Sequence, residues 1–326
     1  MSIVNTTVPI TSESCSRMIR EIVQAYPFCR SEIFATTVFQ RPLQTLVIGN
    51  GPRKVFFSAA HHANEWITSL ILLKYAEELA QAIAENGTVF GVEARTIADT
   101  ATIYMVPMVN PDGVDLVTGA IAPGSISYEA ARELASYYPA IPFPEGWKAN
   151  LLGVDLNLNY PAGWLQAREI KFSQGFTRPG PRDYVGRAPL GQLESRALAG
   201  YTEVIDPALV LAYHTQGGVI YWQFKDYFVP GARELADQFA AVSGYQVEDT
   251  PFASSFAGFK DWFIQQYRRP GYTIEAGRGE NPLPLTQFEE IYADNVGILT
   301  VAAMGELPQN LPEIPQIPID MEQNMI

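Results

Sequence analysis

The stretch Val55-Phe56-Phe57-Ser58-Ala59-Ala60-His61-His62-Ala63-Asn64-Glu65-Trp66-Ile67-Thr68 joins an apolar run to a short polar turn and then to a helical pattern. Residues 55–60 are mostly apolar, as in a strand that is covered on both faces of a sheet. From Glu65 to Ala84, apolar residues recur three or four positions apart, which predicts a helix. A strand that leads directly into a helix is the repeating unit of α/β folds, so this stretch predicts a sheet between helices.

The same alternation of strand-like and helix-like segments continues along the chain. Residues 110 to about 200 are richer in Gly, Pro, Asn and Tyr, which predicts long loops over one edge of the sheet with one helix. No repeat or linker is visible, so we expect one α/β domain around a mixed sheet over residues 1–308, and an extended, Pro-containing tail over residues 309–326. The expected strands are Ile33–Val38, Thr45–Ile48, Val55–Ser58, Thr102–Val106, Pro207–Tyr213, Val219–Gln223 and Gly271–Glu275; the expected helices are Ser12–Tyr26 with Ser12 as N-cap, Glu65–Ala84, Tyr128–Tyr137, Gly231–Val242 and Leu285–Met304.

Composition excludes several classes of function. The 326 residues carry a net charge of −13, which argues against nucleic acid and anionic membranes as partners, because both select basic patches. No secretory signal or membrane-spanning apolar segment is visible, so we expect a cytoplasmic protein with no membrane partner, and no protein partner is inferred. Two cysteines, Cys15 and Cys29, are too few for a disulfide framework; they form one bridge or remain free thiols.

The three histidines of the chain indicate a metal site. His62 and Glu65 are three residues apart at a predicted strand end, and His214 follows the apolar run Leu209–Tyr213. Two imidazoles and one carboxylate are a ligand set for a single catalytic zinc, because three protein ligands leave the fourth position open. His61 is the alternative to His62, but adjacent residues that leave a strand point in opposite directions, and we take His62 as the ligand.

Two further carboxylates fit roles around such a metal. Asp155, in Gly153-Val154-Asp155-Leu156-Asn157, is a candidate to fix the second nitrogen of a ligating imidazole. Glu275 ends the strand-like Tyr272-Thr273-Ile274 and is a candidate base for a water that the metal activates. An aspartate in a turn and a glutamate at a strand end also occur without any such role.

Taken together, five blocks resemble the zinc carboxypeptidase family in content and order. They span about Val55 to Gly279. The resemblance implies an eight-stranded mixed sheet between helices, a zinc ion held by His62, Glu65 and His214, Glu275 as general base and acid, and Asp155 as the group that orients His62. The blocks are His62-Ala63-Asn64-Glu65-Trp66-Ile67-Thr68, Asn110-Pro111-Asp112-Gly113, Gly153-Val154-Asp155-Leu156-Asn157, His214 and Thr273-Ile274-Glu275.

Departures from the family pattern bear on the substrate. Leu158 stands where family members have the arginine that binds the terminal carboxylate of the substrate, and Ala253 stands where they have a tyrosine. Lys148 occupies the place of the arginine that polarises the scissile carbonyl, but a lysine lacks the two-pronged guanidinium. Lys260 matches the position that sets side-chain preference. With Asn157 and Arg278, Lys260 completes the expected substrate-binding set.

One branch of the family fits these departures, because Trp147-Lys148-Ala149-Asn150 and the block from Glu275 to Pro284 resemble bacterial γ-D-glutamyl-diaminoacid peptidases. The resemblance implies a zinc metallopeptidase that cuts the bond between γ-D-glutamate and meso-diaminopimelate in peptidoglycan stem peptides or muropeptides. Diaminopimelate carries a second carboxylate, for which Lys260 or Arg278 is a candidate partner. Two alternatives stay open, namely a carboxypeptidase that releases acidic C-terminal residues and a non-catalytic muropeptide-binding protein.

Overall fold

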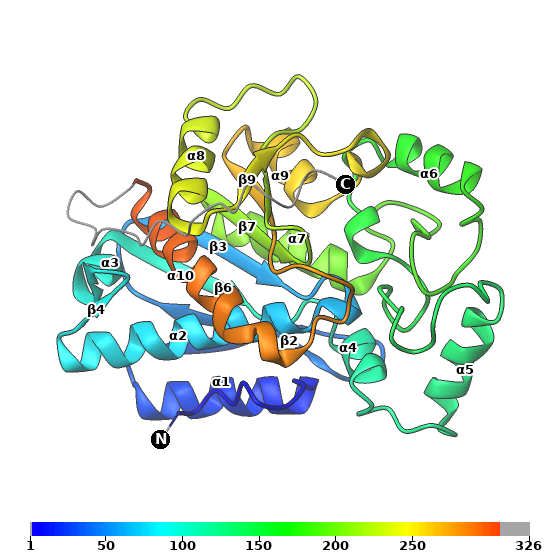
Figure 1. Ribbon diagram of the computed structural model, residues 1–326, viewed down its shortest axis with the longest axis horizontal. Coiled ribbons are helices and arrows are strands. Elements are labelled where there is room, and N and C mark those ends of the chain that lie inside the picture. The colour runs from blue at the N-terminus through cyan, green and yellow to red at the C-terminus, as the bar shows by residue number, and fades with distance from the viewer. Residues whose placement is uncertain (1, 307–326) are drawn as a thin grey trace, which may run out of the picture.

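The structure, a computed structural model, describes residues 2–306, so the predicted tail over residues 309–326 lies outside the described residues. Its helices and strands alternate along the chain (Figure 1). The strands are β1 (Arg30–Thr36), β2 (Pro42–Ile48), β3 (Arg53–Ala59), β4 (Thr88–Val89), β5 (Val92–Glu93), β6 (Ala101–Val106), β7 (Leu209–His214), β8 (Val219–Tyr221), β9 (Gln246–Glu248) and β10 (Gly271–Glu275). The helices are α1 (Ser12–Ala25), α2 (Ile67–Glu85), α3 (Ala94–Thr100), α4 (Pro111–Val117), α5 (Ile126–Ala135), α6 (Trp164–Ser173), α7 (Leu193–Ile205), α8 (Ala232–Ser243), α9 (Phe259–Tyr267) and α10 (Phe288–Met304).

One eight-stranded mixed sheet organises the molecule, as the resemblance implied. Its strand order is β1-β2-β6-β3-β7-β10-β8-β9, and β4 pairs with β5 in a separate two-stranded sheet. The central strands β6, β3, β7 and β10 are parallel, whereas β1, β2 and β8 pair antiparallel to their inner neighbours. Parallel strands end at the same edge of a sheet, so residues at the carboxyl ends of β3, β7 and β10 come together there.

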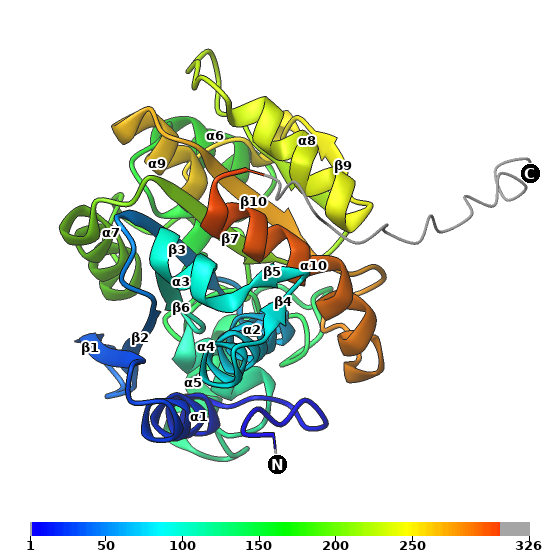
Figure 2. The same ribbon diagram turned by 90° about the vertical axis from the view of Figure 1, so that its left-hand side faces the viewer.

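Helices cover both faces of the sheet because successive side chains of each central strand point to opposite sides (Figures 1 and 2). Phe57 and Leu211 are fully buried in the core that includes residues of α1, α2, α8 and α10. Phe56 and Val210, one residue earlier in each strand, lie in a second core with residues of α6, α7 and α9. Each such buried side chain contributes roughly 1.5–3 kcal/mol to folding, so the central strands rigidly support the residues at their ends.

The prediction of long loops with one helix between residues 110 and 200 was partly wrong: residues 136–155 and 174–192 contain no helix or strand and the predicted helix is α5, but the region also contains α4, α6 and the first part of α7. Two boundaries also differ from prediction. The N-cap of α1 is Thr11, whose hydroxyl accepts from the Ser14 N–H, instead of Ser12. Glu65 lies in a one-turn 3₁₀-helix, Ala63–Glu65, and the α-helix begins two residues later at Ile67.

Cys15 and Cys29 are free and buried, and burial raises the pKa of each thiol to about 12, which disfavours the reactive thiolate. Across residues 2–306, none of the helices has the length and apolar character needed to cross a membrane.

Candidate active site

The turn after β3 is held in a fixed shape by hydrogen bonds. Ala60 has a φ of 51°, which is uncommon for a residue with a side chain. The Ala60 N–H donates to Thr68 Oγ1 over 3.0 Å, and the same hydroxyl donates to the carbonyl of Glu65 over 2.7 Å. The start of α2 is therefore pinned to the end of β3, and His62 and Glu65 face each other across the turn.

Asn110 explains why the second sequence block matters. Its side-chain amide donates to the carbonyls of His61 and Ala149, over 3.2 and 2.9 Å, and its side-chain oxygen caps α4 at Gly113 over 3.1 Å. The end of β3 and the segment that carries Lys148 are thereby joined through one side chain.

Three side chains converge on one point at the sheet edge. His62 Nδ1 and His214 Nδ1 lie 2.9 Å from Glu65 Oε1 and Oε2 respectively, and the two Nδ1 atoms are 3.2 Å apart. Ligand atoms around a tetrahedral zinc lie about 3.3 Å from each other, and one donor atom from each of the three residues lies within 4.8 Å of the others, which is close to the spacing that the metal needs. Of the His, Cys, Asp and Glu side chains in the described chain, these three form the group that could hold a metal ion.

His61 lies outside this group. Its ring is fully buried, stacks on His214 with ring centroids 5.6 Å apart, and places Nε2 3.2 Å from the Tyr160 hydroxyl. Burial lowers the pKa of His61 well below its usual value, so it is a neutral core histidine.

Asp155 contacts the far side of His62, where Asp155 Oδ1 lies 3.1 Å from His62 Nε2. Burial acts to raise the pKa of Asp155, but the charge and hydrogen bond of His62 lower it below the usual value. The Asp155 carboxylate also accepts the backbone N–H groups of Asn157 and Asp183 over 3.1 and 3.2 Å. A carboxylate held this firmly fixes the orientation of the imidazole, as in metal sites generally.

Glu275 and Lys148 approach the cluster from two other segments. Glu275 is the last residue of β10 and pairs in register with His214 of β7. Burial and the nearby charge of Glu65 raise the pKa of Glu275 above its usual value. Lys148 Nζ lies 3.0 Å from Glu65 Oε1. A basic carboxylate and a cation thus flank the same three donors.

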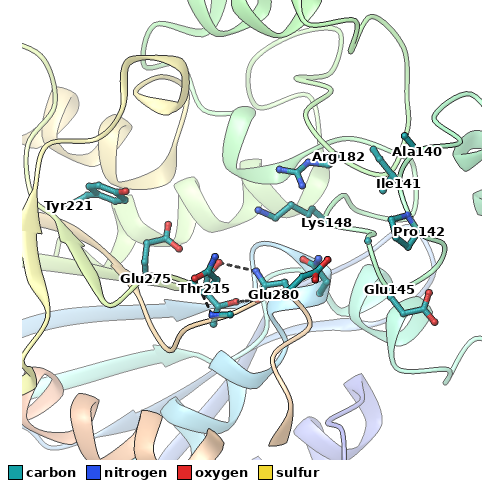
Figure 3. A pocket seen from close by; sticks show the side chains of 15 residues that line it. Ala140, Ile141, Pro142, Glu145, Lys148, Arg182, Thr215, Tyr221, Glu275 and Glu280 are labelled. Atoms are coloured by element: carbon teal, nitrogen blue, oxygen red, sulfur yellow. Dashed lines mark hydrogen bonds between the residues drawn. The ribbon is translucent and has the colours of Figure 1, made fainter. Parts of the chain in front are cut away.

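Two clefts meet at this point. A wide cleft of about 600 Å³ has one wall from residues 140–146 and another from residues 279–281 (Figure 3). A narrow cleft of about 220 Å³ contains His62, Asn157 and Lys260. The clefts share Lys148, Arg182, Tyr221 and Glu275, so they adjoin each other beside the cluster.

The remaining predicted residues fall in different places. Asn157 lines the narrow cleft, and its side-chain oxygen accepts the Phe259 N–H over 3.0 Å. Lys260 lies in the same cleft but is buried, with Nζ 2.7 Å from Asp261 Oδ1 and donating to the Gln223 carbonyl over 2.6 Å. Arg278 is exposed, its guanidinium lies near Gly218, and it is not among the residues that line either cleft. Arg182 and Tyr221 line both clefts and were missed, because neither belongs to any of the sequence blocks.

Comparisons with known proteins agree with the fold. A family model described as zinc carboxypeptidase matches residues 15–297. A curated protein of Lysinibacillus sphaericus, Gamma-D-glutamyl-L-diamino acid endopeptidase 1, is 41% identical over 281 residues, which cover 86% of this chain and 68% of that protein.

Solved structures with low sequence identity share the fold. Carboxypeptidase A from Helicoverpa armigera aligns with a TM-score of 0.65 at 16% identity, over 92% of this chain and 75% of that one. Murein-tripeptide amidase MpaA from Escherichia coli O157 aligns with a TM-score of 0.52 at 18% identity, over 86% of this chain and 93% of that one.

Proposed function

Because the chain belongs to the zinc carboxypeptidase family and is a zinc metallopeptidase, we propose that it hydrolyses the bond between γ-D-glutamate and a diamino acid, meso-diaminopimelate, in peptidoglycan stem peptides or muropeptides. The observation that carries the proposal is the pair of clefts that meet at Glu275 and Lys148, because a substrate then extends on both sides of the cut bond. The name of the Lysinibacillus relative, at 41% identity, supports this choice of bond.

The roles that we propose follow from the positions of the side chains. His62, Glu65 and His214 would hold zinc, which supplies a Lewis acid for the scissile carbonyl and for water. Glu275 accepts a proton from the attacking water and later delivers it to the amine that leaves. Its raised pKa suits both transfers, because a more basic carboxylate takes the proton readily and its acid form returns it.

Lys148 and Asp155 complete the site. The Lys148 ammonium stabilises the negative charge that develops on the carbonyl oxygen. Asp155 acts through His62, whose ring it holds in one orientation. Leu158 is buried and has no hydrogen-bond donor in its side chain, so it does not bind a terminal carboxylate in the way that family members use an arginine.

The narrow cleft favours a diamino acid over a purely acidic residue. Lys260 lies beside Asp261, so its charge is balanced and it does not form an uncompensated cationic pocket for an acidic C-terminal residue. A neighbouring cation and anion match the carboxylate and ammonium that meso-diaminopimelate carries at its distal end. This contrast makes a carboxypeptidase for acidic C-terminal residues the weaker candidate.

The test incubates zinc-loaded protein with L-Ala-γ-D-Glu-meso-diaminopimelate and identifies the products by mass spectrometry. We expect L-Ala-D-Glu and free diaminopimelate. A longer stem peptide, amidated at its C-terminus, should be cut at the same bond. Release of single residues from free-acid peptides alone would instead indicate a carboxypeptidase.

Glu275→Gln should lower kcat by several orders of magnitude while zinc content stays unchanged. Glu280→Gln is the matched control, because Glu280 is exposed and lines only the wide cleft. Retained activity in Glu275→Gln would contradict the role of Glu275.

A further inference from the structure

Arg182 stands where the two clefts meet, in the loop between α6 and α7. Its Nε donates to Asp183 Oδ2 over 2.6 Å. Within residues 2–306, no hydrogen bond uses its two terminal amino groups. The edge of the guanidinium that binds a carboxylate with two parallel hydrogen bonds is therefore free.

The backbone on each side of Arg182 is tied to the proposed catalytic residues. The carbonyl of Pro181 accepts the N–H groups of Lys148 and Ala149 over 2.7 and 2.9 Å. The Asp183 N–H donates to Asp155, the carboxylate that orients His62. Arg182 is thus held at a fixed position relative to the metal ligands.

The side chain of Arg182 is supported by a second cation. Asp183 Oδ1 lies 2.6 Å from Lys171 Nζ of α6, while Asp183 Oδ2 accepts from Arg182. Lys171 and Asp183 are both largely buried. The three side chains Lys171, Asp183 and Arg182 together carry a net charge of +1, which favours an anionic ligand at the free edge of Arg182.

The other cations of the clefts have partners. Lys260 is balanced by Asp261, and Lys148 lies beside Glu65 at the point where the scissile carbonyl would be held. Arg182 and Lys148 both line the two clefts. Figure 3 shows the two cationic side chains on the same side of the wide cleft, opposite Glu275 and Tyr221.

We propose that Arg182 binds the free α-carboxylate of the γ-linked glutamate, on the acyl side of the cut bond, and so selects substrates that carry a carboxylate at this distance from the scissile carbonyl. The inference rests on the proposed function. A γ-linkage leaves this carboxylate about 5 Å from the scissile carbonyl carbon, across three tetrahedral carbons, whereas an α-linked residue with an uncharged side chain leaves no carboxylate there. Arg182 lines the wide cleft as well as the narrow one, which places it within reach of that group.

The test compares L-Ala-γ-D-Glu-meso-diaminopimelate with two analogues, one amidated at the glutamyl α-carboxylate and one amidated at the α-carboxylate of the diamino acid. In the wild type, glutamyl amidation should lower kcat/KM about 10- to 100-fold, because a charged hydrogen-bonded pair is lost. Arg182→Met should cause a similar loss on the free acid and almost none on the glutamyl amide.

Arg178→Met is the matched control, since Arg178 lies in the same loop, is exposed, and packs over the Tyr137 ring. Arg178→Met should keep the full preference of the wild type for the free acid over the glutamyl amide. Zinc content and Tm report whether Arg182→Met is folded. Arg182→Lys, which keeps the charge but loses the two-pronged contact, should fall between the wild type and Arg182→Met.

Two results would overturn the inference. Equal cleavage of the parent peptide and of the glutamyl amide by the wild type would overturn the inference without the need for any variant. The inference would also be overturned if Arg182→Met removed the preference for the parent peptide over the diamino-acid amide. Arg182 would then bind the released residue instead. A wild type that does not cut the parent peptide at all would refute the proposed function, which is a separate outcome.

Discussion

Glu194 provides a quantitative test of how the fold supports the segment that carries Lys148. This carboxyl is 3% exposed on α7, and its Oε1 lies 3.3 Å from Asn150 Nδ2, two residues beyond Lys148. Burial raises the pKa of Glu194 from 4.5 to about 7. The folded state therefore holds this proton more tightly than the unfolded state does.

The sign of the pH effect is set by that shift. Between pH 4.5 and about 7, Glu194 binds more protons in the folded protein than in the unfolded chain. The stabilising contribution of Glu194 is therefore full below pH 4.5 and is lost as the pH rises toward 7. The total loss is about 3 kcal/mol, because one pKa unit corresponds to about 1.4 kcal/mol. Glutamine resembles the protonated acid and keeps an oxygen for Asn150, so Glu194→Gln should remove this loss.

The assay is denaturant unfolding of the wild type and Glu194→Gln at a fixed zinc concentration from pH 5.5 to 8.5. The variant should be more stable by about 1 kcal/mol at pH 5.5 and by about 3 kcal/mol at pH 8.5. Glu203→Gln, an exposed position on the same helix, should give a flat difference. A flat or falling difference for Glu194→Gln would refute the reasoning.

Three further changes test the site. Lys148→Met should lower kcat about 10²- to 10³-fold with zinc retained, measured by steady-state kinetics and metal analysis, because one donor to the developing oxyanion is lost; unchanged kcat would contradict its role. Asp155→Asn should weaken zinc binding about 10- to 100-fold in chelator competition, because it holds His62 less firmly; equal affinity would argue against that support. Lys260→Met should raise KM for diaminopimelate peptides more than for lysine peptides; equal effects would remove Lys260 from substrate recognition.

The sequence predicted the parts of the site that lie at the ends of buried strands. β3, β7 and β10 are recognisable as apolar runs, and parallel strands bring their carboxyl ends together, so the neighbourhood of His62, His214 and Glu275 could be inferred from the pattern. Strand geometry also indicated which ring of the adjacent histidines faces the cluster.

Arg182 was beyond reach for a physical reason. Its position depends on the hydrogen bonds that the Lys148 N–H donates to the Pro181 carbonyl and the Asp183 N–H donates to Asp155, which connect residues 28 or more positions apart. Asp183 adopts a φ of 65°, which no periodic pattern anticipates. A loop held by such contacts has no local sequence signature.

Other misses had a signal that was overlooked. In α7, Leu198, Tyr201 and Ile205 recur at helical spacing and pack in the second core, although the surrounding glycines and prolines suggested a loop. β1 was predicted too late because its first residues, Arg30 and Ser31, are exposed at the edge of the sheet and carry no apolar pattern.

Zinc content of three matched variants tests the central claim most directly. We predict one zinc per chain in the wild type and in His61→Gln, and loss of zinc in His62→Gln and His214→Gln, when each purified protein is analysed by mass spectrometry for metals. His61 is the strict control because it is adjacent to His62 and stacks on His214, yet points to Tyr160. Retention of zinc in His62→Gln and His214→Gln, or its selective loss in His61→Gln, would contradict the account.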